Sequence, residues 1–70
     1  MVTLPLSRVR DAAEALARAD AARETLQRER DAAVAAALEN GATWVQVQEA
    51  AGLSPRGVAL AIRRHRERTT

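Results

Sequence analysis

The chain contains no cysteine, lysine, phenylalanine or tyrosine, and only one tryptophan, three glycines and two prolines among its 70 residues. The lack of cysteine excludes disulfide bonds and thiolate metal sites, although it does not decide the cellular compartment. A chain of this length buries only about 60% of the surface that it exposes when unfolded. Alanine is its most frequent residue, so each buried apolar side chain contributes little at about 25 cal/mol per Å². We therefore expect a partner subunit or DNA to add stability.

The same absences argue against catalysis and against a cofactor. The chain has one histidine, His65, and its carboxylates lie among arginines, where ion pairs explain them better than an acid and a base. No second histidine or cysteine completes a metal site with His65. We expect neither an enzyme nor a metal protein.

Membrane and export signals are also missing from the sequence. No run of about 18 apolar residues is present, and Met1 to Leu6 is too short for the apolar region of a signal peptide. We therefore expect a cytoplasmic protein without membrane contacts.

Charge is distributed unevenly along the chain. Residues 41–70 carry five arginines and two acids, whereas residues 1–40 carry six arginines and seven acids. A local basic patch of this kind is typical of nucleic-acid-binding proteins. Arginine as the sole cation suits bidentate contacts with phosphate and guanine, although a GC-rich genome also explains the choice.

The segment from Arg8 to Asn40 contains no glycine or proline and is rich in strong helix formers. It predicts one helix about 50 Å long, which ends at Asn40-Gly41 because glycine tolerates the left-handed conformation of a helix C-terminus. The polar run 28–31 leaves open a break, after which 29–40 would begin a separate unit. The predicted division is an N-terminal arm over 1–28 and a second unit over 29–70.

Apolar residues recur along this helix at nearly alternating steps of three and four, at Val9, Ala13, Leu16, Ala19, Leu26, Ala33 and Ala37. Arg23 and Arg30 interrupt the pattern, and opposite charges at helical spacing occupy the other faces. The pattern predicts an arm that pairs two copies of the chain, parallel or antiparallel, through Val9, Leu16, Ala19 and Leu26. The alternative is a helix that folds back or stands alone.

Two shorter helices with clear start signals are predicted to follow. Thr43 and Gln46 have the spacing of a capping box, and that helix runs to Ala51. After the turn at Gly52, Ser54 supplies a capping oxygen, and Pro55 occupies a first helical position, where its missing N–H costs nothing. The last helix is predicted over 55–66, and Trp44 is expected to pack in the core between the first and third helices.

Helix, glycine-containing turn and helix is the arrangement of a helix-turn-helix motif. Residues 42–58, together with Ile62, resemble the helix-turn-helix of sigma-factor region 4 and LuxR-type regulators, as found in small actinobacterial or phage DNA-binding proteins. The resemblance assigns the turn to Gly52 and Leu53, and the core positions to Val47, Val58 and Ile62. Gln48 departs from the small residue usual in that family. The resemblance implies an all-α trihelical fold whose last helix reads DNA.

Helical spacing divides the last helix into two faces. Val58, Ala61, Ile62 and His65 share the face expected to be buried. The opposite face and the two helix N-termini, where backbone N–H groups favour phosphate, supply the candidate DNA contacts: Thr43, Gln46, Ser54, Pro55, Arg56, Ala59, Leu60, Arg63 and Arg64. Arg56 is the best candidate for guanine, Ala59 and Leu60 suit thymine methyl groups, and Arg66 and Arg68 would add attraction to the DNA backbone.

These features predict a homodimeric transcriptional regulator on double-stranded DNA, with recognition helices about 34 Å apart. One alternative is a nonspecific nucleoid or architectural DNA-binding protein. The other is a protein-interaction module that docks on the transcription machinery.

Overall fold

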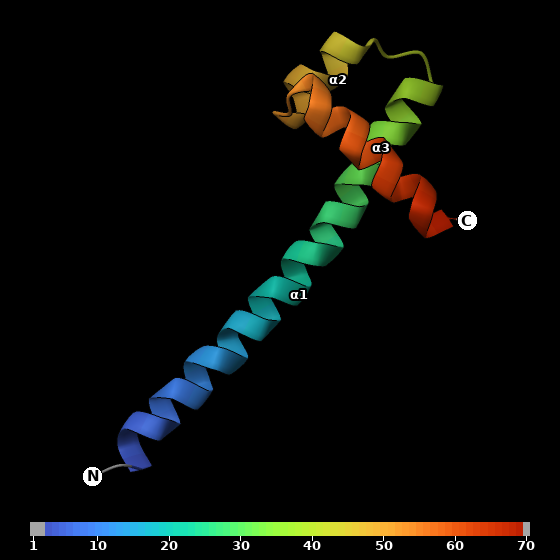
Figure 1. Cartoon of the computed structure of the whole chain (residues 1–70). Coiled ribbons are helices and arrows are strands. Elements are labelled where there is room, and N and C mark those ends of the chain that lie inside the picture. Colours follow the sequence, from blue (N-terminus) through green and yellow to red (C-terminus); the bar gives the residue numbers. More distant parts are fainter. Residues whose placement is uncertain (1–2, 70) are drawn as a thin grey trace.

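The computed structural model describes residues 3–69, which form three helices: α1 (Thr3–Glu39), α2 (Trp44–Ala51) and α3 (Pro55–Thr69). α1 is a long rod, and α2 and α3 gather at its C-terminal end, so the molecule measures 61 × 27 × 16 Å (Figure 1). No strand occurs between residues 3 and 69. The predicted all-α class is confirmed.

α1 is one continuous helix, and the alternative of a break at 28–31 is wrong. The polar residues of that run have partners: Arg28 pairs with Glu24 one turn earlier, at 3.3 Å between Nη2 and Oε1, and Asp31 is buried against α3. The helix also begins at Thr3 rather than at Arg8. Pro5 is tolerated there because it lacks a backbone N–H, and N–H groups in the first turn of a helix have no intrahelical acceptor.

The exposure of side chains changes abruptly along α1. Every side chain from Leu6 to Leu26 is exposed, and half-buried positions begin at Gln27. The predicted boundary between 28 and 29 therefore lies inside a single helix, next to the point where contacts with α2 and α3 begin. We call residues 6–26 the arm and residues 27–69 the head.

α1 ends where the sequence predicts. The N–H of Ala42 donates to the carbonyl of Ala37 at 3.0 Å, and that of Gly41 donates to Leu38 at 3.2 Å. These two bonds form a Schellman motif, which satisfies carbonyls that the helix itself leaves free. Gly41 has a φ of 96°, a conformation that favours glycine because it has no Cβ.

The predicted caps of the two short helices are confirmed. Thr43 Oγ1 accepts from the Gln46 N–H at 3.1 Å, and Gln46 Oε1 accepts from the Thr43 N–H at 2.9 Å. Ser54 Oγ accepts from the Gly57 N–H at 3.0 Å and opens α3. α3 continues to Thr69, three residues beyond the prediction. Arg66 and Arg68 in its last turn favour this extension, because cations stabilise the C-terminus of a helix.

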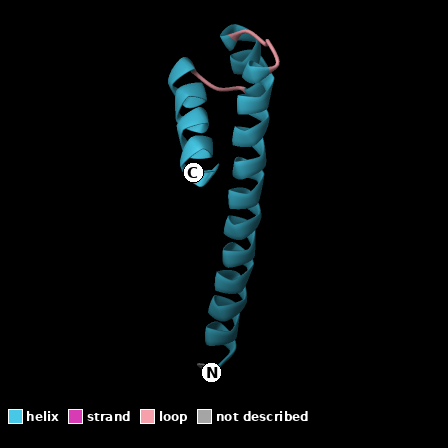
Figure 2. Ribbon diagram, turned by 90° about the vertical axis from the view of Figure 1, so that its right-hand side faces the viewer, coloured by secondary structure: helices cyan, strands magenta, loops and turns pink. Residues whose placement is uncertain are grey.

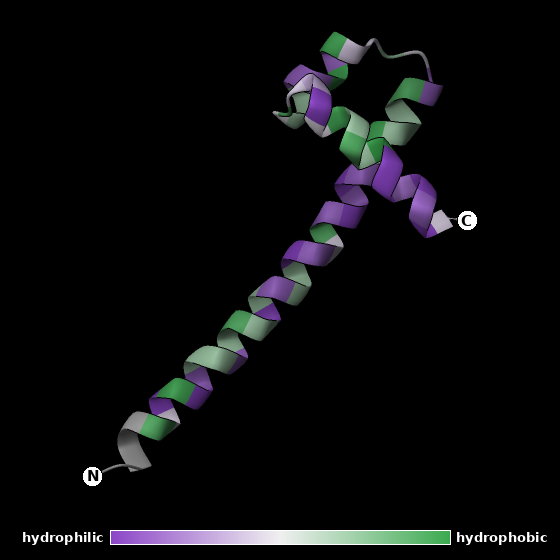
Figure 3. Cartoon of the chain, viewed as in Figure 1, coloured by the Kyte–Doolittle hydropathy of each residue, from purple (hydrophilic) through white to green (hydrophobic). Residues whose placement is uncertain are grey.

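The core is small and takes one or two side chains from each helix: Val34 from α1, Val47 from α2, and Val58 and Ala61 from α3. α3 crosses α1 at a wide angle (Figure 1) and lies on one side of it (Figure 2). Figure 3 shows hydrophobic residues at the crossing of the helices and a mixed pattern along the arm. Trp44 lies beside residues of both α1 and α3, as predicted, but it is 40% exposed, so its predicted burial in the core is wrong. As the first residue of α2, it lies at the edge of the head beside Leu38 and Ile62.

Candidate nucleic-acid interface

α3 has one buried face and one exposed face, as its spacing predicts. Val58 and Ala61 are fully buried, and Ile62 and His65 are half-buried. On the opposite side Arg56, Ala59, Leu60 and Arg63 are all exposed. The structure thus brings four of the predicted contact residues together on one outward surface, which we call the outer face of α3.

The predicted phosphate contacts at the helix N-termini serve as caps. Thr43 and Gln46 bind each other's backbone, and Ser54 binds the Gly57 N–H. All three side chains and Pro55 are nevertheless exposed. These side chains therefore cap the N-termini of α2 and α3. Both N-termini are exposed, as a contact with an anion requires.

A buried carboxylate joins α1 to α3, and sequence reasoning missed it. Asp31 is completely buried. Its Oδ2 accepts from Arg64 Nε at 3.0 Å and from Arg68 Nη1 at 2.9 Å. Its Oδ1 accepts from Arg64 Nη2 at 3.3 Å and from Arg30 Nη2 at 3.3 Å. We call these four residues the Asp31 cluster.

Burial and hydrogen bonding act in opposite directions on Asp31. Burial alone raises the pKa of its carboxyl, because it disfavours the charged form. The hydrogen bonds from Arg64, Arg68 and Arg30 outweigh burial and leave the pKa below its ordinary value. The hydrogen bond to Asp31 in turn raises the pKa of Arg64. Asp31 is therefore an anion that neutralises part of the basic charge of α3.

Arg64 lies differently from the prediction. It was expected on the outward side with Arg56 and Arg63, but its guanidinium turns to α1 and binds both carboxylate oxygens of Asp31. The reason is the register of the two helices, which places it opposite a buried acid that a bidentate guanidinium matches. The signal in the sequence was one acid on the buried face of α1, three residues before Val34 and seven before Leu38.

Two arginines remain on the outer face of α3. Arg63 Nε lies 3.3 Å from Glu67 Oε1, and both side chains are well exposed, so this pair is weak. Arg56 forms no ion pair with any residue between 3 and 69. It lies in the first turn of α3, where its guanidinium is available to an external acceptor.

Other kinds of site receive no support from the described residues. Between residues 3 and 69 no group of three or more histidines and acids is arranged to hold a metal ion. The helices in that range include none with enough length and apolar character to cross a membrane.

Comparison of the chain with protein-family models, curated proteins and solved structures gives no match.

Proposed function

We propose that the chain is a homodimeric DNA-binding regulator of transcription that places α3 in the major groove. The proposal rests on the resemblance of residues 42–62 to a helix-turn-helix and on the geometry of the head. α2 and α3 are joined by a short glycine turn, and both pack on the C-terminal part of α1. In such motifs the second helix enters the groove, and the other helices brace it.

The single observation that carries the proposal is the outer face of α3. Its first turn presents Arg56, which has no partner among residues 3–69, and the next two turns present Ala59, Leu60 and Arg63. The opposite side of the same helix is fixed by Val58, by Ala61 and by the Asp31 cluster. A rigid helix with an exposed cationic side matches what the reading of base edges requires.

The side chains of this face suit different parts of a DNA duplex. The guanidinium of Arg56 can donate two hydrogen bonds to guanine, one to O6 and one to N7. Ala59 and the 39%-exposed Leu60 suit contact with thymine methyl groups. Arg63 and the exposed caps Thr43 and Ser54 suit phosphates, which position a protein without specifying sequence.

One observation favours a second candidate, a protein-interaction module that docks on the transcription machinery. Trp44 and Val45 are 40% and 60% exposed at the start of α2, and Trp44 lines a shallow depression with Ile62 and Arg66. Exposed aromatic and apolar groups beside an arginine are common at protein interfaces. A second depression beside Trp44 includes Ala59 and Arg63, so this surface adjoins the outer face of α3.

Titration of a fluorescent random-sequence duplex at two salt concentrations tests the proposal. We expect binding at low salt and a loss of roughly 100-fold in affinity between 50 and 200 mM salt, the change for about four neutralised phosphates. The absence of binding at 50 mM, by a chain that circular dichroism shows to be helical, would contradict DNA binding and favour the protein-interaction module.

A further inference from the structure

One side of α1 carries a regular seam, most of which the single chain leaves uncovered. Because α1 is continuous, nine positions with alternating steps of three and four lie along one side of it: Val9, Ala12, Leu16, Ala19, Arg23, Leu26, Arg30, Ala33 and Ala37. The three largest apolar members, Val9, Leu16 and Leu26, are 65%, 62% and 63% exposed. This arm seam has the spacing of a helix that packs against another helix over its whole length.

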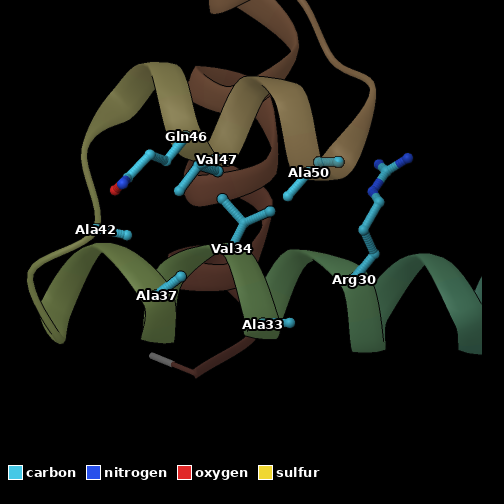
Figure 4. A pocket seen from close by; sticks show the side chains of 9 residues that line it. Arg30, Ala33, Val34, Ala37, Ala42, Gln46, Val47 and Ala50 are labelled. Atoms are coloured by element: carbon cyan, nitrogen blue, oxygen red, sulfur yellow. The ribbon is translucent and has the colours of Figure 1, made fainter.

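At its C-terminal end the arm seam runs into an apolar groove between α1 and α2. The groove has a volume of about 430 Å³, and alanine and valine side chains from both helices form its walls (Figure 4). Ala33 and Ala37 belong to both the seam and the groove, and Arg30 lies at the end toward the arm. The groove is therefore a continuation of the seam, bounded on one side by α2.

We infer that two copies of α1 pair in an antiparallel orientation over their full length, about a two-fold axis near residue 21. The segment from Leu6 to Val9 of one copy then lies in the groove of the other. This inference rests on the homodimer of the proposed function and specifies how it is built. Residue 21 is the midpoint of α1, so this register gives the longest overlap of the two helices.

The register pairs complementary sizes along the seam. Positions whose numbers add to 42 face each other, which gives Val9 with Ala33, Ala12 with Arg30, Leu16 with Leu26, and Ala19 with Arg23. Each seam arginine thus faces an alanine, and its aliphatic stem covers the small side chain. The guanidinium of Arg30 stays on Asp31, and that of Arg23 reaches water. The four leucines of the dimer form two layers, one on each side of the two central Ala19–Arg23 layers.

A parallel pair has the opposite properties. It would place Arg23 on Arg23 and Arg30 on Arg30 at the centre of the interface, where like charges repel. It would also place alanine on alanine at residues 12, 19 and 33, which leaves the interface poorly filled. The two α2 helices, which border the seam at the same end, would crowd each other. The charges and sizes along the seam therefore select the antiparallel pair.

Antiparallel pairing also arranges the two heads for one duplex. Asp31, which binds α3, follows Arg30 of the seam directly, so α3 lies about 100° around α1 from the seam. A two-fold axis perpendicular to both arms then puts the two α3 helices on the same face of the dimer. In this register the two copies of Val34, on which α3 packs, are 26 residues apart along the helix axis. At 1.5 Å per residue, the two α3 helices are therefore about 40 Å apart. One turn of DNA is about 34–36 Å.

Cysteine cross-linking tests the pairing, since the chain has no cysteine of its own. The full-length variants Val9→Cys and Ala33→Cys, one carrying a tag, are oxidised separately and as a mixture without DNA. A disulfide needs Cα atoms within about 7 Å, whereas two copies of residue 9 are about 36 Å apart in the antiparallel dimer. We expect the mixture to form a disulfide-linked heterodimer at least tenfold faster than either variant forms a homodimer.

Three outcomes would overturn the inference. Rapid homodimer formation by each variant alone indicates a parallel pair. Faster coupling of Val9→Cys to Leu26→Cys than to Ala33→Cys indicates a register shifted by seven residues, which leaves the groove empty. A wild-type chain that sedimentation equilibrium shows to be monomeric removes the pairing altogether. Cross-linking needs no DNA, so a failure of DNA binding and a failure of this dimer are distinguished.

Discussion

Replacing Asp31 with alanine is expected to lower the free energy of unfolding by about 2–4 kcal/mol. Removing one partner from a buried ion pair costs about 3–5 kcal/mol. The arginine side chains of the cluster are 30–38% exposed and recover part of their hydration, which reduces that cost. Chemical denaturation followed by circular dichroism measures the change.

Asp20→Ala is the matched control, because it removes an exposed acid from the same helix. We expect it to change the free energy of unfolding by less than about 0.5 kcal/mol. Equal effects of Asp31→Ala and Asp20→Ala would show that the Asp31 cluster does not hold α3 against α1.

The same carboxylate gives stability a defined dependence on pH. The pKa of Asp31 is lowered in the folded chain, so the unfolded chain takes up the proton first as the pH falls. Its contribution is therefore present above the unfolded value of about 3.9 and is lost as the pH falls through the folded pKa. In Asp31→Asn this component is absent, and stability should fall less steeply below about pH 4. Parallel profiles would contradict the lowered pKa.

Replacing Arg56 with alanine is expected to weaken binding to a preferred duplex by about 10–100-fold. A bidentate contact with guanine contributes about 1–3 kcal/mol of discrimination, and each 1.4 kcal/mol is a factor of ten. Arg56 is the candidate because it is exposed in the first turn of α3 and has no ion-pair partner within residues 3–69. Competition titrations with the preferred duplex and a random duplex measure the effect, and we expect a smaller loss for the random duplex.

Arg18→Ala provides the control for charge. It removes the same cation from the exposed arm, on the side of α1 away from both the seam and α3. We expect little change in either affinity. If Arg56→Ala instead lowers both affinities equally and reduces the salt dependence by about one phosphate, Arg56 contacts only the DNA backbone. That result would favour the nonspecific DNA-binding alternative.

Local signals predicted most of the head. The Asn40-Gly41 stop, the Thr43–Gln46 capping box and the Ser54-Pro55 start each depend on a few neighbouring residues, and the structure confirms them. The inward face of α3 was also predicted in Val58 and Ala61, because helical spacing alone decides which residues share a side.

Features that depend on contacts distant in sequence were missed. Asp31 and Arg64 are 33 residues apart, and only the packed register of α1 against α3 brings them together. The prediction that Arg64 faces outward was wrong for that reason. Trp44 was predicted in the core, but as the first residue of α2 it lies at the edge of the head, outside the core of three valines and one alanine. The arm was predicted as a pairing surface, and the groove that extends its seam was missed because it forms only where α2 packs on α1.

In the proposed function, the outer face of α3 reads DNA in a two-fold symmetric dimer. The most direct test of this role is selection of a random duplex pool by the full chain at moderate salt, followed by sequencing of the bound fraction. We expect an enriched palindrome whose half-sites lie about one helical turn apart. A bound fraction with the same sequence composition as the starting pool would contradict the proposal.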